Sequence, residues 1–198
     1  MAILAPSSSG SGGSNLNWGI KDQPAIPGTY VGVVLDCLEA TIKNQFAKTE
    51  DDPKERNVCR WLIAYLNDDD EICLAQSREM TQSGNESSHL FAFLKGLLGQ
   101  DPVFDNEYDY LGEVGRPCMV NIGQGKSAKG TIYPVVNGVS VITKRLAGGA
   151  PDPHEIEVPG GRRSEVQYEA PKAPAKTKAK AKAKAKPVED DLDDNPFG

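Results

Sequence analysis

The chain has 198 residues, a formal net charge of −6 and a hydrophobic share of 38%. This length predicts one domain with appended segments, and the low apolar share places part of the chain outside any core. The negative charge argues against a protein whose whole surface binds nucleic acid, because phosphate contacts come from lysine and arginine. A basic segment confined to one part of the chain is still compatible with such binding.

The N-terminal residues 1–27 are rich in Ser, Gly, Pro and Asn, a composition typical of a flexible arm. Trp18 is the exception, and we expect it to fold back and cap the domain. The first residues have no basic region before their short apolar run, so no signal peptide is expected. No apolar run approaches the length of a membrane span, which favours a soluble, cytoplasmic protein.

Three segments between residues 27 and 80 predict strands. Residues 27–42 and 58–66 are rich in β-branched and aromatic residues, and residues 71–80 follow a turn at 67–70. An acidic stretch over residues 48–57 separates the first strand from the second. Because turn residues separate all three segments, the pattern indicates a meander.

The apolar spacing then changes to that of a helix over residues 87–99, with a serine at the N-cap and Gly99 after the last turn. Residues 117–122 and 130–142 predict two further strands. The loop that joins them, 123–130, contains two lysines, small residues and no acidic residue.

Three strands, one helix and two strands follow one another in the order of an OB-fold. We therefore predict an all-β domain over residues 28–146, a β-barrel with one helix in the order β-β-β-α-β-β. An immunoglobulin-like sandwich needs about seven strands and no central helix. A parallel α/β sheet needs helices between most of its strands.

Charge is segregated at the C-terminal end. Residues 171–188 contain seven lysines and no acidic residue, whereas residues 189–198 contain five acidic residues and no basic one. Runs of like charge with few apolar residues are typical of disordered segments. We predict a disordered linker over 147–187, rich first in Pro and Gly and then in Ala and Lys, followed by an acidic tip over 188–198.

The sequence contains no recognisable motif for catalysis or for metal binding. The four cysteines lack the spacing of zinc ligands and fall inside apolar stretches, so we expect buried free thiols in a reducing compartment. The two histidines have no partner motif, and the 123–130 loop lacks P-loop spacing. We expect a binding protein without a cofactor rather than an enzyme.

Single-strand binding needs aromatic platforms for bases and positive charge for phosphates. Tyr133, beside the basic loop, is the preferred aromatic contact. Residues 58–66 allow two registers. If the face with Leu62 and Ala64 is buried, Trp61 and Tyr65 form an exposed platform; if Arg60 faces solvent, Trp61 and Tyr65 lie in the core. The basic loop has an ordinary solvated hairpin as its alternative. The candidate nucleic-acid-binding residues are Tyr30, Lys43, Arg60, Trp61, Tyr65, Lys126, Lys129, Tyr133, Lys144 and Arg145.

The chain ends in VEDDLDDNPFG, where a phenylalanine follows an acidic run. An OB-fold body, a low-complexity linker and an acidic tip ending near Pro-Phe together resemble the single-stranded DNA-binding proteins of bacteria and phages. The body looks more like the divergent phage-encoded binders, with PGTY opening the first strand and LGEVGRPCMVNI leading into the fourth. For a phage protein, the expected location is the cytoplasm of the host bacterium.

In that family the tip docks replication, recombination and repair proteins through its terminal phenylalanine and carboxylate. Gly198 departs from this pattern because it separates the α-carboxylate from the ring. The resemblance implies a partner-binding set of Asp190, Asp191, Asp193, Asp194, Pro196 and Phe197.

The resulting hypothesis is a sequence-tolerant single-stranded DNA binder that protects DNA during replication and recombination and recruits partners through its tip. A homo-oligomer is compatible with this function. The alternative is an OB-fold protein-interaction module or phage virion-associated scaffold that binds no nucleic acid. The acidic body favours the alternative, whereas the basic loop, the lysine-rich linker and the Pro-Phe tip favour DNA binding.

Overall fold

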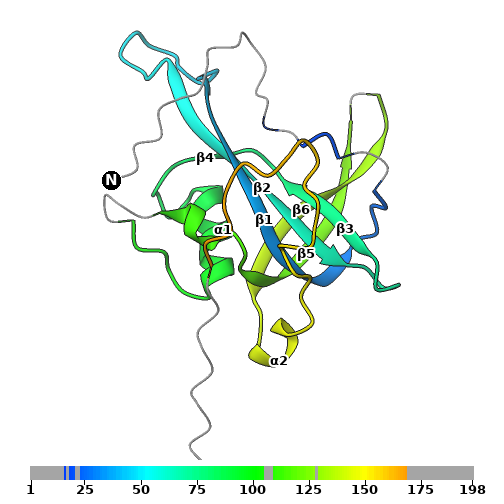
Figure 1. Cartoon of the computed structure of the whole chain (residues 1–198). Helices are drawn as coiled ribbons and strands as arrows, with labels where there is room; N and C mark the ends of the chain where they lie inside the picture. Colours follow the sequence, from blue (N-terminus) through cyan, green and yellow to red (C-terminus); the bar gives the residue numbers. More distant parts are fainter. Residues whose placement is uncertain (1–15, 17, 21–22, 105–108, 128, 169–198) are drawn as a thin grey trace, which may run out of the picture.

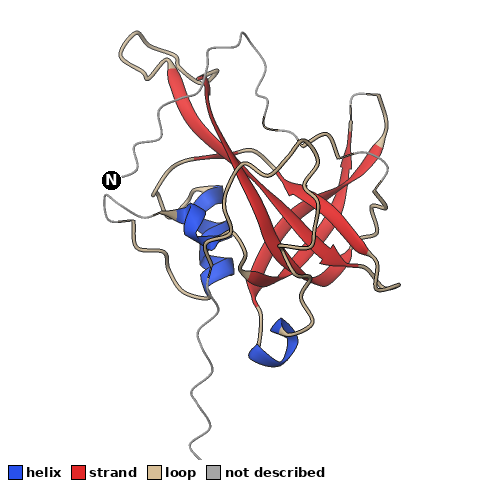
Figure 2. Cartoon of the chain, in the orientation of Figure 1, coloured by secondary structure: helices blue, strands red, loops and turns tan. Residues whose placement is uncertain are grey.

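A computed structural model describes residues 16, 18–20, 23–104, 109–127 and 129–168 of the chain. Within these residues a six-stranded sheet dominates the fold, and the main helix packs at one side of it (Figures 1 and 2). The prediction of a mostly β domain with one main helix is therefore confirmed.

The strands match the five predicted segments, with the third segment divided in two. They are β1 (Gly28–Lys43), β2 (Glu55–Leu66), β3 (Ile72–Ser77), β4 (Met80–Thr81), β5 (Pro117–Lys126) and β6 (Ile132–Val141). The helices are α1 (His89–Leu98), a 3-10 helix at Tyr110–Glu113 and the short α2 (Lys144–Ala147). Neither α1 nor α2 has the length and apolarity that crossing a bilayer would require.

Both predicted ends of α1 are present. The Ser88 side chain accepts a hydrogen bond from the backbone N–H of Phe91 at 3.1 Å, as an N-cap residue does. Gly99 follows the helix in the left-handed region, with a φ of 72°, where a residue without a Cβ is favoured. Local sequence signals therefore fix this helix.

Strand pairing runs β1-β5-β6-β3-β2-β4, and β1 also pairs with β2. The long β1 is thus hydrogen-bonded to β5 through residues 28–33 and to β2 through residues 32–43. β3 and β6 pair in parallel, whereas the other pairs are antiparallel. Two hairpins project from this arrangement: the β1–β2 hairpin, with its loop at residues 44–54, and the β5–β6 hairpin, with its loop at residues 127–131 (Figure 1).

Two apolar clusters lie on opposite faces of β2, because alternate residues of a strand point to opposite sides. The inner cluster contains Trp61 and Ile63 and packs against Leu94 of α1. The outer cluster contains Leu62 and Ala64. A strand buried on both faces has no polar side to reveal its register, which is why the sequence left two registers open.

Two segments predicted to be flexible cover the outer cluster. Leu16 and Trp18 of the N-terminal arm are buried against it, and so is Val158. The sequence predicts a flexible arm and a disordered linker here; among the described residues of these two segments, Leu16, Trp18 and Val158 are buried. The expectation that Trp18 caps the domain is confirmed.

The carboxylate of Asp36 joins these covering segments to the sheet. Asp36 is 0% exposed and lies at a bulge of β1, where the register to β2 shifts. Its Oδ2 accepts hydrogen bonds from Trp18 Nε1 at 3.1 Å and from the backbone N–H of Arg163 at 3.0 Å. Its Oδ1 accepts from the backbone N–H groups of Cys37 and Ser164, at 2.9 and 2.8 Å. Both ends of the described chain are thus tied to one buried charge.

The cysteines Cys37, Cys59, Cys73 and Cys118 are all buried and free, which confirms the prediction of buried thiols. Burial raises the pKa of the Cys118 thiol to about 12, and burial is also the main cause of the raised pKa of Cys37. Both thiols are therefore protonated at neutral pH and behave as small apolar side chains.

We predict that Asp36→Asn lowers the free energy of unfolding by about 2 kcal/mol or more, since hydrogen bonds to a charged group contribute roughly 1.5–3 kcal/mol each. Urea unfolding measures this change. The same variant should shift Trp18 fluorescence to longer wavelength, because release of the arm exposes its indole. Asp51→Asn, at an exposed position in the 44–54 loop, is the matched control. Equal unfolding midpoints for the two variants would contradict the role given to Asp36.

Candidate nucleic-acid interface

Three of the predicted aromatic contacts lie in the inner cluster rather than on the surface. Tyr30, Trp61 and Tyr65 are 7%, 0% and 1% exposed. Trp61 stacks on Phe93 of α1 with 5.2 Å between ring centroids, and Tyr30 lies 5.1 Å from Tyr65. Burial raises the pKa of Tyr65. No base can reach these rings in the folded domain, so their prediction as DNA contacts is wrong.

The other two predicted contacts of the sheet, Arg60 and Tyr133, come together. Both line a pocket of about 130 Å³ formed by β2, β3, β6 and the residues that follow β3. Arg60 belongs to the outer face of β2, where it is half-buried. Its Nη1 donates a hydrogen bond to the backbone carbonyl of Leu16 at 2.8 Å. Arg60 therefore links the first described residue of the arm to the pocket.

Tyr133 owes its position to a glycine. Gly125 is its cross-strand partner on β5, and a Cβ added at Gly125 would lie 2.5 Å from Tyr133 Cε2. The ring therefore lies across the hairpin against the glycine backbone. Tyr133 is half-buried, so part of its ring stays open to a ligand.

The β1–β2 hairpin presents the ring of Phe46, which the sequence places beside a predicted strand as a possible stacking platform but which is not in the set of candidate DNA contacts. Phe46 is 70% exposed, and Asn44 holds its backbone in a turn by accepting from the Phe46 N–H at 3.1 Å. The guanidinium carbon of Arg56 lies 5.3 Å from the centroid of the ring. The signal available in the sequence was an aromatic residue beside a strand, because aromatic side chains are the platforms on which single-stranded bases stack.

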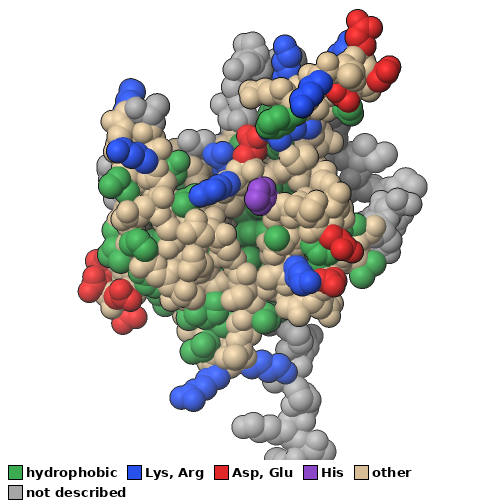
Figure 3. Space-filling model, turned by 180° about the vertical axis from the view of Figure 1, so that it is seen from behind, with side chains coloured by type: hydrophobic (Ala, Val, Ile, Leu, Met, Phe, Trp, Pro, Cys, Tyr) green, Lys and Arg blue, Asp and Glu red, His purple; other side chains and the backbone are tan. Residues whose placement is uncertain are grey.

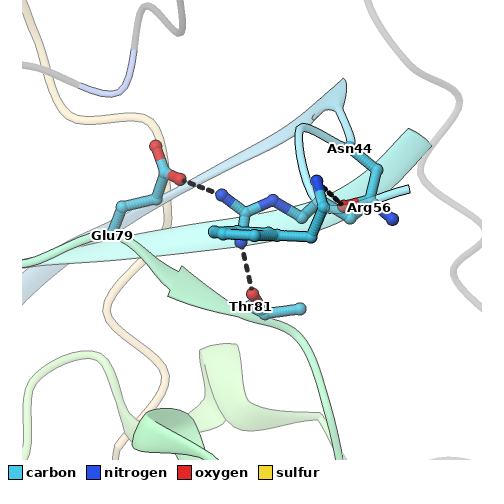
Figure 4. Close-up of polar contacts among 5 residues, drawn as sticks. Asn44, Arg56, Glu79 and Thr81 are labelled. Atoms are coloured by element: carbon cyan, nitrogen blue, oxygen red, sulfur yellow. Dashed lines mark hydrogen bonds and ion pairs between the residues drawn. The ribbon is translucent and has the colours of Figure 1, made fainter. Parts of the chain in front are cut away.

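Arg56 is fixed in this position by two partners. Its Nη2 lies 3.1 Å from Glu79 Oε1 and its Nη1 donates to Thr81 Oγ1 at 2.9 Å (Figure 4). Glu79 also lines the pocket that contains Tyr133. Side chains therefore lead from Phe46 through Arg56 and Glu79 to the pocket that Tyr133 lines. We call this surface the inter-hairpin strip; its residues are Phe46, Arg56, Arg60, Arg78, Glu79 and Tyr133.

The predicted lysines divide into two groups. Lys43 lies at the end of β1, and Lys126 and Lys129 lie at the β5–β6 hairpin; all three are exposed at the ends of the strip. Figure 3 shows basic side chains on both projecting hairpins. Lys144 and Arg145 are exposed on α2, beyond the opposite end of the ten-residue β6, about 30 Å from Tyr133 at 3.3 Å per residue. The structure therefore does not bring them to the strip.

The acidic residues of the 44–54 loop serve in part to fold it. Asp52 accepts hydrogen bonds from the backbone N–H groups of Thr49 at 2.9 Å and Lys48 at 2.7 Å. These bonds lower the pKa of the Asp52 carboxyl, with the Thr49 backbone as the largest cause. The carboxylate thus acts as a local cap within the loop.

The predicted partner-binding set lies outside the described residues; it comprises Asp190, Asp191, Asp193, Asp194, Pro196 and Phe197. In the part of the chain that the structure describes, no group of three His, Cys, Asp or Glu side chains is arranged to hold a metal ion. No protein-family model matches the chain, and no curated protein matches it in sequence.

We predict that Gly125→Ala displaces the Tyr133 ring, because the new Cβ would overlap it. Two-dimensional NMR should show shifted Tyr133 ring resonances and unchanged Trp61 indole signals. Gly138→Ala is the control, since a Cβ there meets nothing within 4 Å. Unchanged Tyr133 resonances in Gly125→Ala would show that the ring does not lie on the glycine.

Proposed function

We propose that the sheet is an OB-fold and that the inter-hairpin strip binds single-stranded DNA. Three features support the fold proposal. β1 pairs with both β5 and β2, so the order β1-β5-β6-β3-β2 leads back to β1; β3 and β6 pair in parallel; and α1 follows β3 and the short β4 and precedes β5. In an OB-fold, the face formed by the second and third strands binds oligonucleotides between the loops after the first and fourth strands. The strip occupies the corresponding surface.

The observation that carries the proposal is an aromatic ring at each hairpin, exposed for Phe46 and half-buried for Tyr133, with arginines between them. Phe46 and Tyr133 offer π-faces to bases, which stack on aromatic side chains whatever their identity. Arg60 and Arg78 provide positive charge between the two rings, and Arg56 stiffens the Phe46 platform. A protein with an acidic average can bind DNA in this way because its basic groups are concentrated locally.

The described part of the chain ends far from this surface. Tyr168, the last described residue, donates its backbone N–H to Val114 O at 3.0 Å, and Arg116 lies 4.2 Å from its ring centroid. Arg116 precedes β5, whereas the strip meets the other end of that ten-residue strand, about 30 Å away. We therefore assign strand binding to the folded domain, and recruitment of replication, recombination and repair proteins to the acidic tip.

Phe46→Ala in the full chain should weaken binding to oligo-dT by about 5- to 150-fold, because one stacked base contributes roughly 1–3 kcal/mol. Fluorescence anisotropy of a labelled oligonucleotide measures the dissociation constant. Stability should change little, since the removed ring is mostly exposed and its cation–π contact contributes about 0.5–1 kcal/mol.

Ile72→Ala is the matched control for loss of an exposed apolar side chain. Ile72 is 52% exposed and pairs with Leu66, at the far end of β2 and about 35 Å from the β1–β2 hairpin. It should leave oligo-dT affinity unchanged. Equal oligo-dT affinities for Phe46→Ala and Ile72→Ala would show that the strip is not part of the binding surface. Failure of the unaltered chain to bind any oligonucleotide would favour the protein-interaction module, which the net charge of −6 also favours.

A further inference from the structure

The pocket in the inter-hairpin strip is larger than a hydration site. Its volume is about 130 Å³, whereas a buried water needs only about 10–15 Å³ of such space. The Tyr133 ring forms part of its wall. A planar aromatic ligand therefore fits the pocket in size, and it would lie beside an aromatic surface.

The wall of the pocket contains a polar residue where an aliphatic one would pack. Gln76 on β3 is the cross-strand partner of Leu62 and of Val135. Its carbonyl oxygen Oε1 is covered and has no hydrogen-bond partner among the described residues, and the same is true of Arg60 Nε. Each such group carries a desolvation cost when left unpaired. A ligand that draws both groups into hydrogen bonds would recover that cost.

The charges around the pocket select the kind of ligand. Glu79 contributes a carboxylate and Gln76 an amide carbonyl, and both oxygens accept hydrogen bonds. The Glu79 carboxylate repels a phosphate but accepts from the N–H groups of a base. Arg60 and Arg78 donate hydrogen bonds from the same wall. The complementary ligand is a planar ring with donors and acceptors side by side.

We propose that this pocket binds one base of a single strand by its edge and prefers guanine; this inference rests on the proposed function. Guanine offers N1–H and N2–H₂ as donors to Gln76 and Glu79, and O6 and N7 as acceptors to an arginine. Thymine has a single donor, and adenine and cytosine have one amino group each. The domain therefore binds most of the strand by stacking and reads one position of it.

Competition against labelled oligo-dT tests this inference with the full chain. An unlabelled oligo-dT with one central guanine should compete at least about fivefold better than pure oligo-dT, because a good arginine–guanine pair discriminates by roughly 5- to 150-fold. Gln76→Leu, which fits between two aliphatic neighbours, should reduce this ratio to near one. Gln100→Leu, at an exposed site after α1, should retain the ratio.

Three other outcomes would contradict this inference, and they separate it from the proposed function. If the chain binds oligo-dT without a guanine preference, or if Gln76→Leu keeps the preference, the pocket does not read a base, although the proposed function stands. If dGMP alone binds as tightly as the guanine-containing strand, the pocket serves a free nucleotide and the inference fails. If no oligonucleotide binds, the proposed function fails and this inference fails with it.

Discussion

The buried carboxylate of Asp36 is the interaction on which the arrangement of this protein depends. It accepts hydrogen bonds from the Trp18 indole N–H and from the backbone N–H groups of residues 163 and 164. These bonds hold two covering segments against the outer face of the sheet. A buried charge is tolerated only when it is fully hydrogen-bonded, and here four N–H donors surround it. Because these covers bury the outer cluster, β2 carries apolar residues on both of its faces.

The described N-terminal residues also adjoin the inter-hairpin strip, because the Leu16 carbonyl accepts a hydrogen bond from Arg60, which lines the pocket. The strip has Phe46 and Tyr133 at its ends. Each ring is held by its own hairpin, through the Asn44 turn in one and through Gly125 in the other. We propose that rigid hairpins keep the two platforms apart before a strand arrives, which reduces the ordering cost of binding.

Most of the secondary structure could be predicted from the sequence because it is encoded locally. The β-branched runs, the Ser88 cap and Gly99 each act within a few residues. The register of β2 could not be predicted, since its outer face is covered by segments almost 40 residues before it and about 90 residues after it in the chain. For the same reason, Trp61 and Tyr65 could not be assigned to the core. The burial of Leu16 and Val158 could not be predicted either, because both lie in stretches whose overall composition indicates flexibility.

In the candidate site, too, the features encoded locally could be predicted and those that depend on tertiary contacts could not. Tyr133 and the hairpin lysines were predicted because turn chemistry marks a hairpin locally, whereas the contact of Arg56 with Phe46 depends on tertiary structure. The most direct test of the account is the affinity of a chain ending at Tyr168, which retains every contact of Asp36, for oligo-dT and for a duplex of equal length. We predict that it binds oligo-dT nearly as tightly as the full chain does, and binds the duplex much more weakly. Loss of oligo-dT binding in a truncated chain that remains folded, or equal affinity for the duplex, would contradict the account.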